Sequence, residues 1–326
     1  MLNKGTLISA VKVITSARLH LGFFDLNGDL ERKFGSMGIS LDNPVTEMVL
    51  RPSKTILATG AEALRAVQVI HQIKASLELP ANQGVEIEIT QAIPSHAGLG
   101  SGTQLALAVG VAFCRLYGLK CDARYIAEIT ARGVRSGIGI GTFLQGGLIV
   151  DGGRGPNTLI PPILARIHFP EIWRILIIMD TEDQGISGEQ ESKAFNRLQP
   201  VSSSAADKLC RQVLMQALPA LLEADLPRFG VAVNALQQAT GDYFAPIQGG
   251  RYASKKITAV LEFLQQQGVT CFGQSSWGPT GFAIFDNQLQ AEMTLAQLNH
   301  EFADMRLFIK VCRASNQGAK IFDMEN

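Results

Sequence analysis

The stretch Pro94-Ser95-His96-Ala97-Gly98-Leu99-Gly100-Ser101-Gly102-Thr103 decides the fold of this chain. It follows Val85 to Ile89, whose alternation of apolar and charged residues predicts a half-buried strand. It precedes Leu105 to Tyr117, an apolar segment that predicts a buried helix ending at Gly118. Closely spaced glycines let a backbone approach a ligand, and the free N–H groups of a helix start favour a phosphate. We therefore predict a phosphate-binding loop; the alternative is a plain tight turn packed on a helix.

This loop differs from two other phosphate-binding motifs. No lysine follows its last glycine, so it is not a Walker A loop. The strand–helix–strand context of a dinucleotide fingerprint is also missing. The loop therefore indicates phosphate binding of another kind.

The rest of the chain predicts two α+β domains. A length of 326 residues with 46% hydrophobic content suits two medium-sized cores. Glycine, proline and asparagine cluster at 152–162, so we place the boundary there, giving domains 1–158 and 159–326. Amphipathic or buried patterns predict helices at 61–77, 207–223, 226–239 and 254–267, strands at 174–179, 281–285 and 306–311, and a polar loop at 183–204.

Composition excludes several classes of protein. Lys and Arg number 29, as do Asp and Glu, so no basic surplus favours nucleic acid. The longest nearly uncharged apolar run, Leu105 to Cys114, is too short to cross a bilayer, and Met1 to Ser16 lacks the features of a signal peptide. The five cysteines have no CxxC spacing, which argues against a zinc site or a disulfide framework. We expect a soluble cytoplasmic protein that acts on small molecules.

The pattern Pro-x-x-x-Gly-Leu-Gly-Ser-Gly-Thr resembles the central phosphate motif of the GHMP kinases, which wraps the phosphates of ATP. Segments 16–21 and 273–281 lie where that superfamily has its N-terminal segment and its C-terminal glycine-rich loop. The resemblance implies a ribosomal-S5-domain-2-like N-terminal domain and a ferredoxin-like C-terminal domain. By analogy it also implies a homodimer.

The chain departs from the kinases where their chemistry is done. Many GHMP kinases have Ser-Gly-Ile-Asp after the third helix, and the Asp is the base toward the substrate hydroxyl. Here the segment is Ser136-Gly137-Ile138-Gly139, and glycine has no side chain to take a proton. Several kinases also carry Gly-Glu-His after the N-terminal segment, where this chain has Gly22-Phe23-Phe24.

The altered segments resemble a non-kinase branch, the β-ribofuranosylaminobenzene 5′-phosphate synthases. That family condenses phosphoribosyl pyrophosphate with 4-aminobenzoate, releases pyrophosphate and carbon dioxide, and serves the biosynthesis of methanopterin-type carriers. The resemblance implies a magnesium-dependent reaction with no ATP requirement, and it leaves open which aryl acid is used. The segments that carry it are 18–21, 25–28, 132–139, 146–153 and 273–279.

Residues that flank these motifs are the candidate catalytic groups. Arg18 and His20 alternate along the first strand, so we expect them on one face, where Arg would clamp an anion and His would donate a proton or a hydrogen bond. Asp25 is a candidate for magnesium or for ribose hydroxyls, and Arg135, like Arg132, for an anion. The alternatives are a solvated strand face, a turn-capping Asp and surface charges.

The candidate binding residues come from three glycine-rich segments. Backbone N–H groups of the loop are expected to hold the diphosphate, and Trp277 offers a stacking face for an aromatic substrate or is a core residue. The set is Ser95, His96, Gly98, Gly100, Ser101, Gly102, Thr103, Ser136, Gln274, Ser275, Ser276 and Trp277. Metal ligands are not assigned, since Asp180, Glu189 and Glu191 are weak candidates. The rival hypotheses are an ATP-dependent small-molecule kinase, which would need a base in place of Gly139, and a non-catalytic binding protein.

Overall fold

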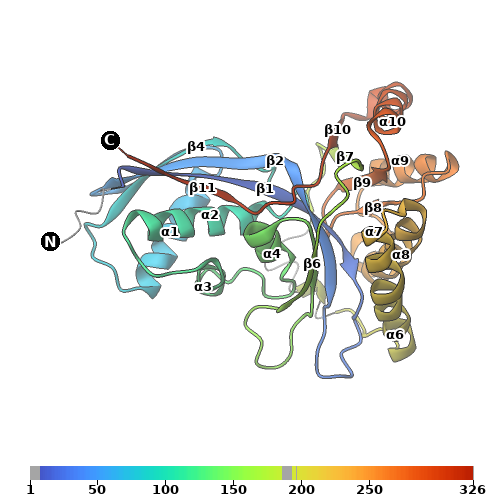
Figure 1. Ribbon diagram of the computed structural model, residues 1–326, viewed down its shortest axis with the longest axis horizontal. Coiled ribbons are helices and arrows are strands. Elements are labelled where there is room, and N and C mark those ends of the chain that lie inside the picture. The colour runs from blue at the N-terminus through green and yellow to red at the C-terminus, as the bar shows by residue number, and fades with distance from the viewer. Residues whose placement is uncertain (1–7, 186–192, 196, 326) are drawn as a thin grey trace.

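The computed structural model describes residues 8–185, 193–195 and 197–325, which form two sheets side by side with helices packed on them (Figure 1). The first sheet has the order β11-β1-β2-β4-β3. In addition, β5 pairs with the N-terminal end of β2, and β6 pairs with β5. Its strands are β1 Ala10–Phe23, β2 Ser36–Ser53, β3 Ile56–Gly60, β4 Gly84–Gln91, β5 Leu148–Asp151, β6 Ile163–Ile167 and β11 Lys320–Met324. Its helices are α1 Ala63–Ser76, α2 Ser101–Leu116, α3 Ala123–Ile129 and α4 Ile138–Gln145.

The second sheet is antiparallel, with the order β10-β7-β9-β8. In chain order this is 4-1-3-2 with helices after the first and third strands, which is the ferredoxin-like arrangement predicted. The strands are β7 Arg174–Asp180, β8 Phe272–Gln274, β9 Thr280–Phe285 and β10 Leu307–Cys312. The helical segments are α6 Ser203–Gln212, η1 Val213–Ala217, α7 Leu218–Leu222, α8 Leu226–Gln248, α9 Lys255–Gln266, α10 Gln288–Glu301 and η2 Ala303–Met305.

The domain boundary predicted at 158/159 needs correction. It falls between β5 and β6, which pair antiparallel in one sheet. The C-terminal strand β11 also returns to the first sheet, where it pairs with β1. The first sheet therefore contains strands that precede the second domain in the sequence and a strand that follows it. The local composition of 152–162 does not reveal these pairings.

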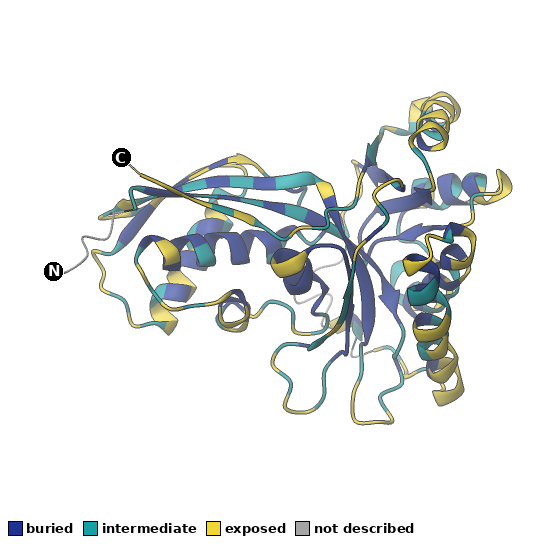
Figure 2. Ribbon diagram, viewed as in Figure 1, coloured by how far each residue is buried: buried dark blue, intermediate teal, exposed yellow. Residues whose placement is uncertain are grey.

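The long strands β1 and β2 contribute to both hydrophobic cores. Val11 and Val13 pack with α1 and α2, whereas Leu19 and Leu21 belong to the core shared with β7 and α8. These strands are buried where they pass between the two halves of the molecule (Figure 2). The cleft described below therefore lies on strands that are held from both sides.

Most helices lie where the sequence predicts them. Ser254 caps α9 by accepting from the amides of Lys256 and Ile257. Helix α8 runs to Gln248, past the predicted end at 239, although Pro246 lies inside it. Of the loop predicted at 183–204, residues 186–192 and 196 lie outside the described residues, and α6 begins at Ser203.

Candidate active site

Helix α2 begins inside the glycine-rich loop, which creates the phosphate site. Gly100 is its N-cap with φ 81°, a conformation that glycine adopts at little cost. The amides of Ser101 and Gly102 belong to the first helical turn and have no acceptor within the helix. The predicted helix from Leu105 thus starts four residues earlier, and its positive end faces the loop.

Four consecutive carbonyl groups of the loop accept hydrogen bonds from other segments of the chain. The carbonyl of His96 accepts from the Gly185 amide at 2.8 Å, and the carbonyl of Leu99 accepts from the Arg18 amide at 3.0 Å. Those of Ala97 and Gly98 accept from the hydroxyls of Thr280 (2.6 Å) and Ser275 (2.8 Å). In a trans peptide the N–H points opposite to the preceding C=O, so each amide that follows one of these carbonyls points away from the donor that the carbonyl binds. This arrangement suits an anion.

Two glycine-rich segments touch through their backbones. A Cβ on Gly98 would lie 2.3 Å from the carbonyl oxygen of Ser275, and a Cβ on Gly278 would lie 2.3 Å from the amide of Gly98. Glycine at both positions is therefore required by the close approach of the two segments. This contact explains why both segments have to be glycine-rich.

A first cavity of about 500 Å³ opens on this loop. Arg65 and Arg132 flank Gly102, since a Cβ there would lie 2.5 Å from one guanidinium nitrogen of Arg65 and 3.3 Å from one of Arg132. Burial, together with the nearby positive charge of Arg65, lowers the pKa of Arg132 below its usual value. The Nε atom of Arg132 is buried and has no hydrogen-bond partner among the described residues. Two like charges beside the amides of a helix start are typical of a site for a multiply charged anion. The cavity is lined by Arg18, Arg65, Gln68, His96, Gly98, Gly100, Ser101, Gly102, Thr103, Arg132, Gly185, Ser276, Trp277 and Gly278.

A second cavity of about 420 Å³ adjoins the first. The two share Arg18, Thr103, Arg132 and Ser276, which mark the border. The other lining residues are His20, Phe23, Ala131, Gly133, Val134, Arg135, Ser136 and Gly139. Phe23 gives this cavity an aromatic wall, so it suits a ring beside the anion site.

Arg18 and His20 both line the second cavity because residues two apart on a strand share a face, and a shift earlier in β1 decides which face this is. Thr15 donates to Gln104 of α2, and Arg18 lies against Gly100 at the start of the same helix. In a regular strand residues 15 and 18 would point to opposite faces. The pairing of β1 with β2 shifts between Ser16 and Arg18, and such an irregularity reverses the alternation.

His20 is a neutral hydrogen-bond donor. Its Nδ1 accepts from the Gly22 amide at 3.2 Å, which leaves the proton on Nε2. Burial, and secondly the positive charge of Arg18, lowers the pKa of His20 to about 3. The buried Nε2 has no partner among the described residues. The imidazole thus offers a hydrogen bond to a ligand, rather than the transferable proton of an imidazolium.

Four predicted site residues line neither cavity. The prediction of Asp25 as a catalytic residue needs correction, because its carboxylate caps a turn by accepting from the amides of Asn27 (2.9 Å) and Gly28 (3.2 Å). Asp25 lines a separate cavity. Ser95 holds Arg65 at 3.0 Å, and Ser275 accepts from the His20 amide at 3.0 Å. Gln274 accepts from the Ala253 amide at 2.7 Å and donates to the Ser276 carbonyl at 2.9 Å. The last three position residues that do line the site.

Trp277 borders the first cavity but its ring is already stacked. The Phe244 ring lies 3.8 Å away at an interplanar angle of 20°, and only 2% of Trp277 is exposed. Arg135 lies over the ring of Phe195 at 4.5 Å. Of the two interpretations of Trp277, the core residue is the one that the packing favours, and Phe23 is the aromatic group that lines the second cavity.

Of the residues that the structure describes, no acidic one lines either cavity. At Gly139, where many GHMP kinases have the base, a Cβ would lie 3.0 Å from the methyl carbon of Thr103. Within the described ranges, no group of three or more His, Cys, Asp or Glu could hold a metal. The lining side chains that the structure describes therefore do not fit a magnesium ion held by protein carboxylates.

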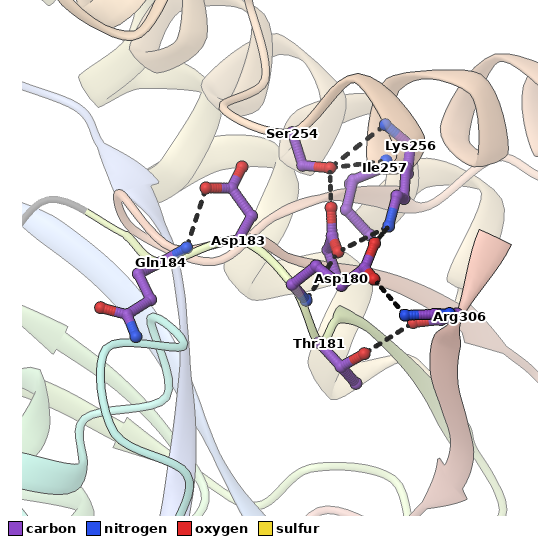
Figure 3. Close-up of polar contacts among 9 residues, drawn as sticks. Asp180, Thr181, Asp183, Gln184, Ser254, Lys256, Ile257 and Arg306 are labelled. Carbon is purple, nitrogen blue, oxygen red and sulfur yellow. Dashed lines mark hydrogen bonds and ion pairs between the residues drawn. The ribbon is translucent and has the colours of Figure 1, made fainter.

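Asp180, a weak metal candidate, is occupied by other partners (Figure 3). It accepts from the Ser254 hydroxyl at 2.7 Å and pairs with Lys256 at 3.3 Å. Lys256 also pairs with Glu182 at 2.6 Å, and Glu182 with Arg306 at 2.9 Å. Two carboxylates thus meet two cations, which leaves no excess negative charge for a metal. Glu189 and Glu191 lie outside the described residues.

Sequence reasoning missed Arg65 and Asp151. Arg65 lies in the first turn of α1. A basic side chain at the start of a predicted helix was the local sequence feature that could have pointed to its role in the site. Asp151 ends β5, has no exposed surface and accepts four hydrogen bonds. It holds the segment that begins α4, although the sequence shows it only as part of a turn.

Comparisons with known proteins agree with this geometry. The models for the GHMP kinase N-terminal and C-terminal domains match residues 62–147 and 217–304. Among solved structures, Lactococcus lactis galactokinase has a TM-score of 0.69 at 16% identity, with 95% of each chain covered. Homoserine kinase from Cytophaga hutchinsonii has a TM-score of 0.67 at 19% identity, covering 99% of this chain and all of that one. Fold and loop thus define a protein of the GHMP kinase class.

Curated relatives narrow this class. A protein of Archaeoglobus fulgidus named beta-ribofuranosylphenol 5'-phosphate synthase is 34% identical over 95% of this chain and 99% of its own length. A protein of the same name from Methanocaldococcus jannaschii is 31% identical over 94% of this chain and 99% of its own. The chain belongs to the beta-ribofuranosylphenol 5'-phosphate synthase family. No helix of the described residues is long and apolar enough to span a membrane.

Proposed function

We propose that this protein joins the ribose of phosphoribosyl pyrophosphate to an aryl acid, with release of pyrophosphate and carbon dioxide. The observation that carries the proposal is the lining of the two cavities, which among the described residues holds four arginines and no carboxylate. Such a site stabilises a departing diphosphate, and none of its described lining side chains is a carboxylate that could contact the hydroxyl of an alcohol directly. The kinase hypothesis needs a base in place of Gly139, where an added Cβ would lie 3.0 Å from the methyl carbon of Thr103.

The donor occupies the first cavity. Its diphosphate lies on the amides at the start of α2, between Arg65 and Arg132. Arg18, at the border, faces the bond between ribose and diphosphate, where negative charge grows on the leaving oxygen as the bond breaks. Magnesium arrives with the diphosphate rather than on protein carboxylates, and ATP is not required.

The aryl acid occupies the second cavity, against Phe23. The ring carbon that bears the carboxylate attacks C1 of the ribose, and loss of carbon dioxide then restores the aromatic ring. His20 Nε2–H and Arg135 are the donors that orient the acid. The relatives are named for a phenol product, which would arise from 4-hydroxybenzoate, whereas 4-aminobenzoate would give the aminobenzene analogue. The product is a precursor of a methanopterin-type carrier, and the protein acts as a cytoplasmic homodimer.

Incubation of the purified protein with phosphoribosyl pyrophosphate, magnesium and each aryl acid tests the proposal. We expect pyrophosphate and carbon dioxide in equal amounts without ATP. Phosphorylation of an alcohol by ATP, with no release of carbon dioxide from either acid, would show a kinase instead.

A further inference from the structure

Asp151 is connected to the acceptor cavity through a single hydroxyl. Its Oδ2 accepts from the Ser136 hydroxyl at 3.0 Å, from the Ser36 hydroxyl at 2.5 Å and from the Gly137 amide at 2.9 Å. Ser136 lines the second cavity, whereas Asp151 has no exposed surface. The carboxylate thus lies one hydroxyl behind the wall of that cavity.

The position of Ser136 matches one end of the aryl acid. The carbon that attacks the ribose must face the border between the cavities, so the para substituent points away from it across the ring. Away from the border the polar side chains of the second cavity are His20, Arg135 and Ser136. His20 offers an N–H there and Arg135 has only donors, so Ser136 is the side chain that accepts a proton from a para hydroxyl.

We propose that Ser136 and Asp151 form a proton relay that takes the proton of the para substituent during ring attack and returns it after decarboxylation. This rests on the proposed function and assigns the acceptor class: benzoates whose para group carries a removable hydrogen. Asp151 is a positioning residue and proton store that acts through Ser136. Neither residue forms a covalent bond with the substrate.

The relay balances in two steps. First the ring carbon bonds to C1 of the ribose, and the C1–O bond breaks with its electron pair leaving on pyrophosphate. The para O–H proton moves to Ser136 Oγ while the Ser136 proton moves to Asp151 Oδ2, and the ring becomes a dienone. Then the bond to the carboxylate breaks, its electron pair restores the ring, carbon dioxide leaves, and the proton returns by the same path. Asp151 is ionised at the start and at the end.

The charge state of Asp151 supports this role. Burial raises the pKa of Asp151 to about 6, against four hydrogen bonds that favour the ionised form. Ser36, Ser136, Gly137 and Gly153, which bond to it, carry no charge, and Arg32 binds the neighbouring carbonyls of Gly152 and Gly153. A base is most effective when its pKa lies near the working pH, so this carboxylate suits reversible proton transfer.

The test compares Ser136→Ala and Asp151→Asn with the matched control Ser254→Ala. Ser254 is also a buried serine bonded to an aspartate, Asp180, and it lines neither cavity (Figure 3). With 4-hydroxybenzoate we expect kcat to fall about 10²-fold or more in both relay variants, as for loss of a general base. The KM for phosphoribosyl pyrophosphate should stay within threefold of wild type, and the control should keep the wild-type kcat.

A pH profile separates the relay from a structural role. The wild-type kcat should rise with pH through about 6, as Asp151 ionises. Ser136→Ala should lack this rise, and because Ser136→Ala keeps the buried carboxylate it remains informative if Asp151→Asn fails to fold. A wild-type kcat and pH profile in Ser136→Ala would overturn the relay while leaving the proposed function intact. A wild-type protein that releases carbon dioxide from neither aryl acid would instead overturn the proposed function, and the relay with it.

Discussion

Replacement of Arg18 by alanine removes the guanidinium at the border of the two cavities. Arg18 donates to the carbonyl of Gly98, and its side chain lies 3.0–3.3 Å from the position of a Cβ on Gly100. Loss of a donor directed at developing negative charge costs about 10²–10³-fold in kcat, or about 2.7–4 kcal/mol. We therefore expect a decrease of this size in pyrophosphate release by Arg18→Ala.

The effect on stability should be much smaller. A hydrogen bond from a charged group contributes about 1.5–3 kcal/mol to folding. Here the Gly98 carbonyl keeps a second donor, the Ser275 hydroxyl at 2.8 Å, so it is not left unsatisfied. The loss should be at the lower end of that range, and removing one positive charge near Arg132 offsets part of it.

The assay measures pyrophosphate release and thermal unfolding of Arg18→Ala beside the control Arg166→Ala. Arg166 also donates to backbone carbonyls, those of Gln145 and Gly146, and it lines neither cavity. We expect the control to retain wild-type kcat. Wild-type turnover in Arg18→Ala with an unchanged melting profile, or an equal loss in Arg166→Ala, would refute the assignment of Arg18.

Three further predictions concern glycines and a buried carboxylate. Gly278→Ala should raise the KM for phosphoribosyl pyrophosphate at least about tenfold, since its methyl would push the two glycine-rich segments apart. The control Gly250→Ala, where the added Cβ meets a single neighbour at 3.7 Å, should keep the wild-type KM, as measured by steady-state kinetics. Gly139→Asp should not create a kinase, because base and acceptor must be aligned together; an ATP-dependent phosphorylation assay that shows product would contradict this. Because the native pKa of Asp151 is raised to about 6 from 3.8, the native state binds an extra proton between these values. Its contribution to stability should therefore fall by about 1.4 kcal/mol per pH unit as pH rises from 4 to 6. Urea unfolding of wild type and Asp151→Asn should show their difference changing in that direction, and a constant difference would count against the raised pKa.

The glycine-rich loop and its helix could be predicted because their signal is local. Glycine spacing and an apolar helix lie in one continuous segment of the sequence. That Arg18 and His20 lie on one face of β1 was also predictable from strand alternation. The shift in register between Ser16 and Arg18 was not predictable, since it depends on the pairing of β1 with β2.

What the sequence could not provide are contacts between distant segments. Arg65 reaches the loop through the packing of α1 on α2, and Asp151 meets Ser36 because β5 pairs with β2. The stacking of Trp277 on Phe244 joins a loop to a helix, so the sequence alone left open whether its ring is a stacking face or a core residue. In each case a single residue type fits several roles, and tertiary packing selects one of them.

The most direct test of the central claim follows the new carbon–carbon bond. The protein would be supplied with phosphoribosyl pyrophosphate labelled with ¹³C at C1 of the ribose and with 4-hydroxybenzoate labelled at the carboxyl-bearing ring carbon, without ATP. The account predicts a product whose two labelled carbons show one-bond ¹³C–¹³C coupling, formed together with pyrophosphate. A product without that coupling, or an aryl acid that keeps its carboxylate, would contradict the account.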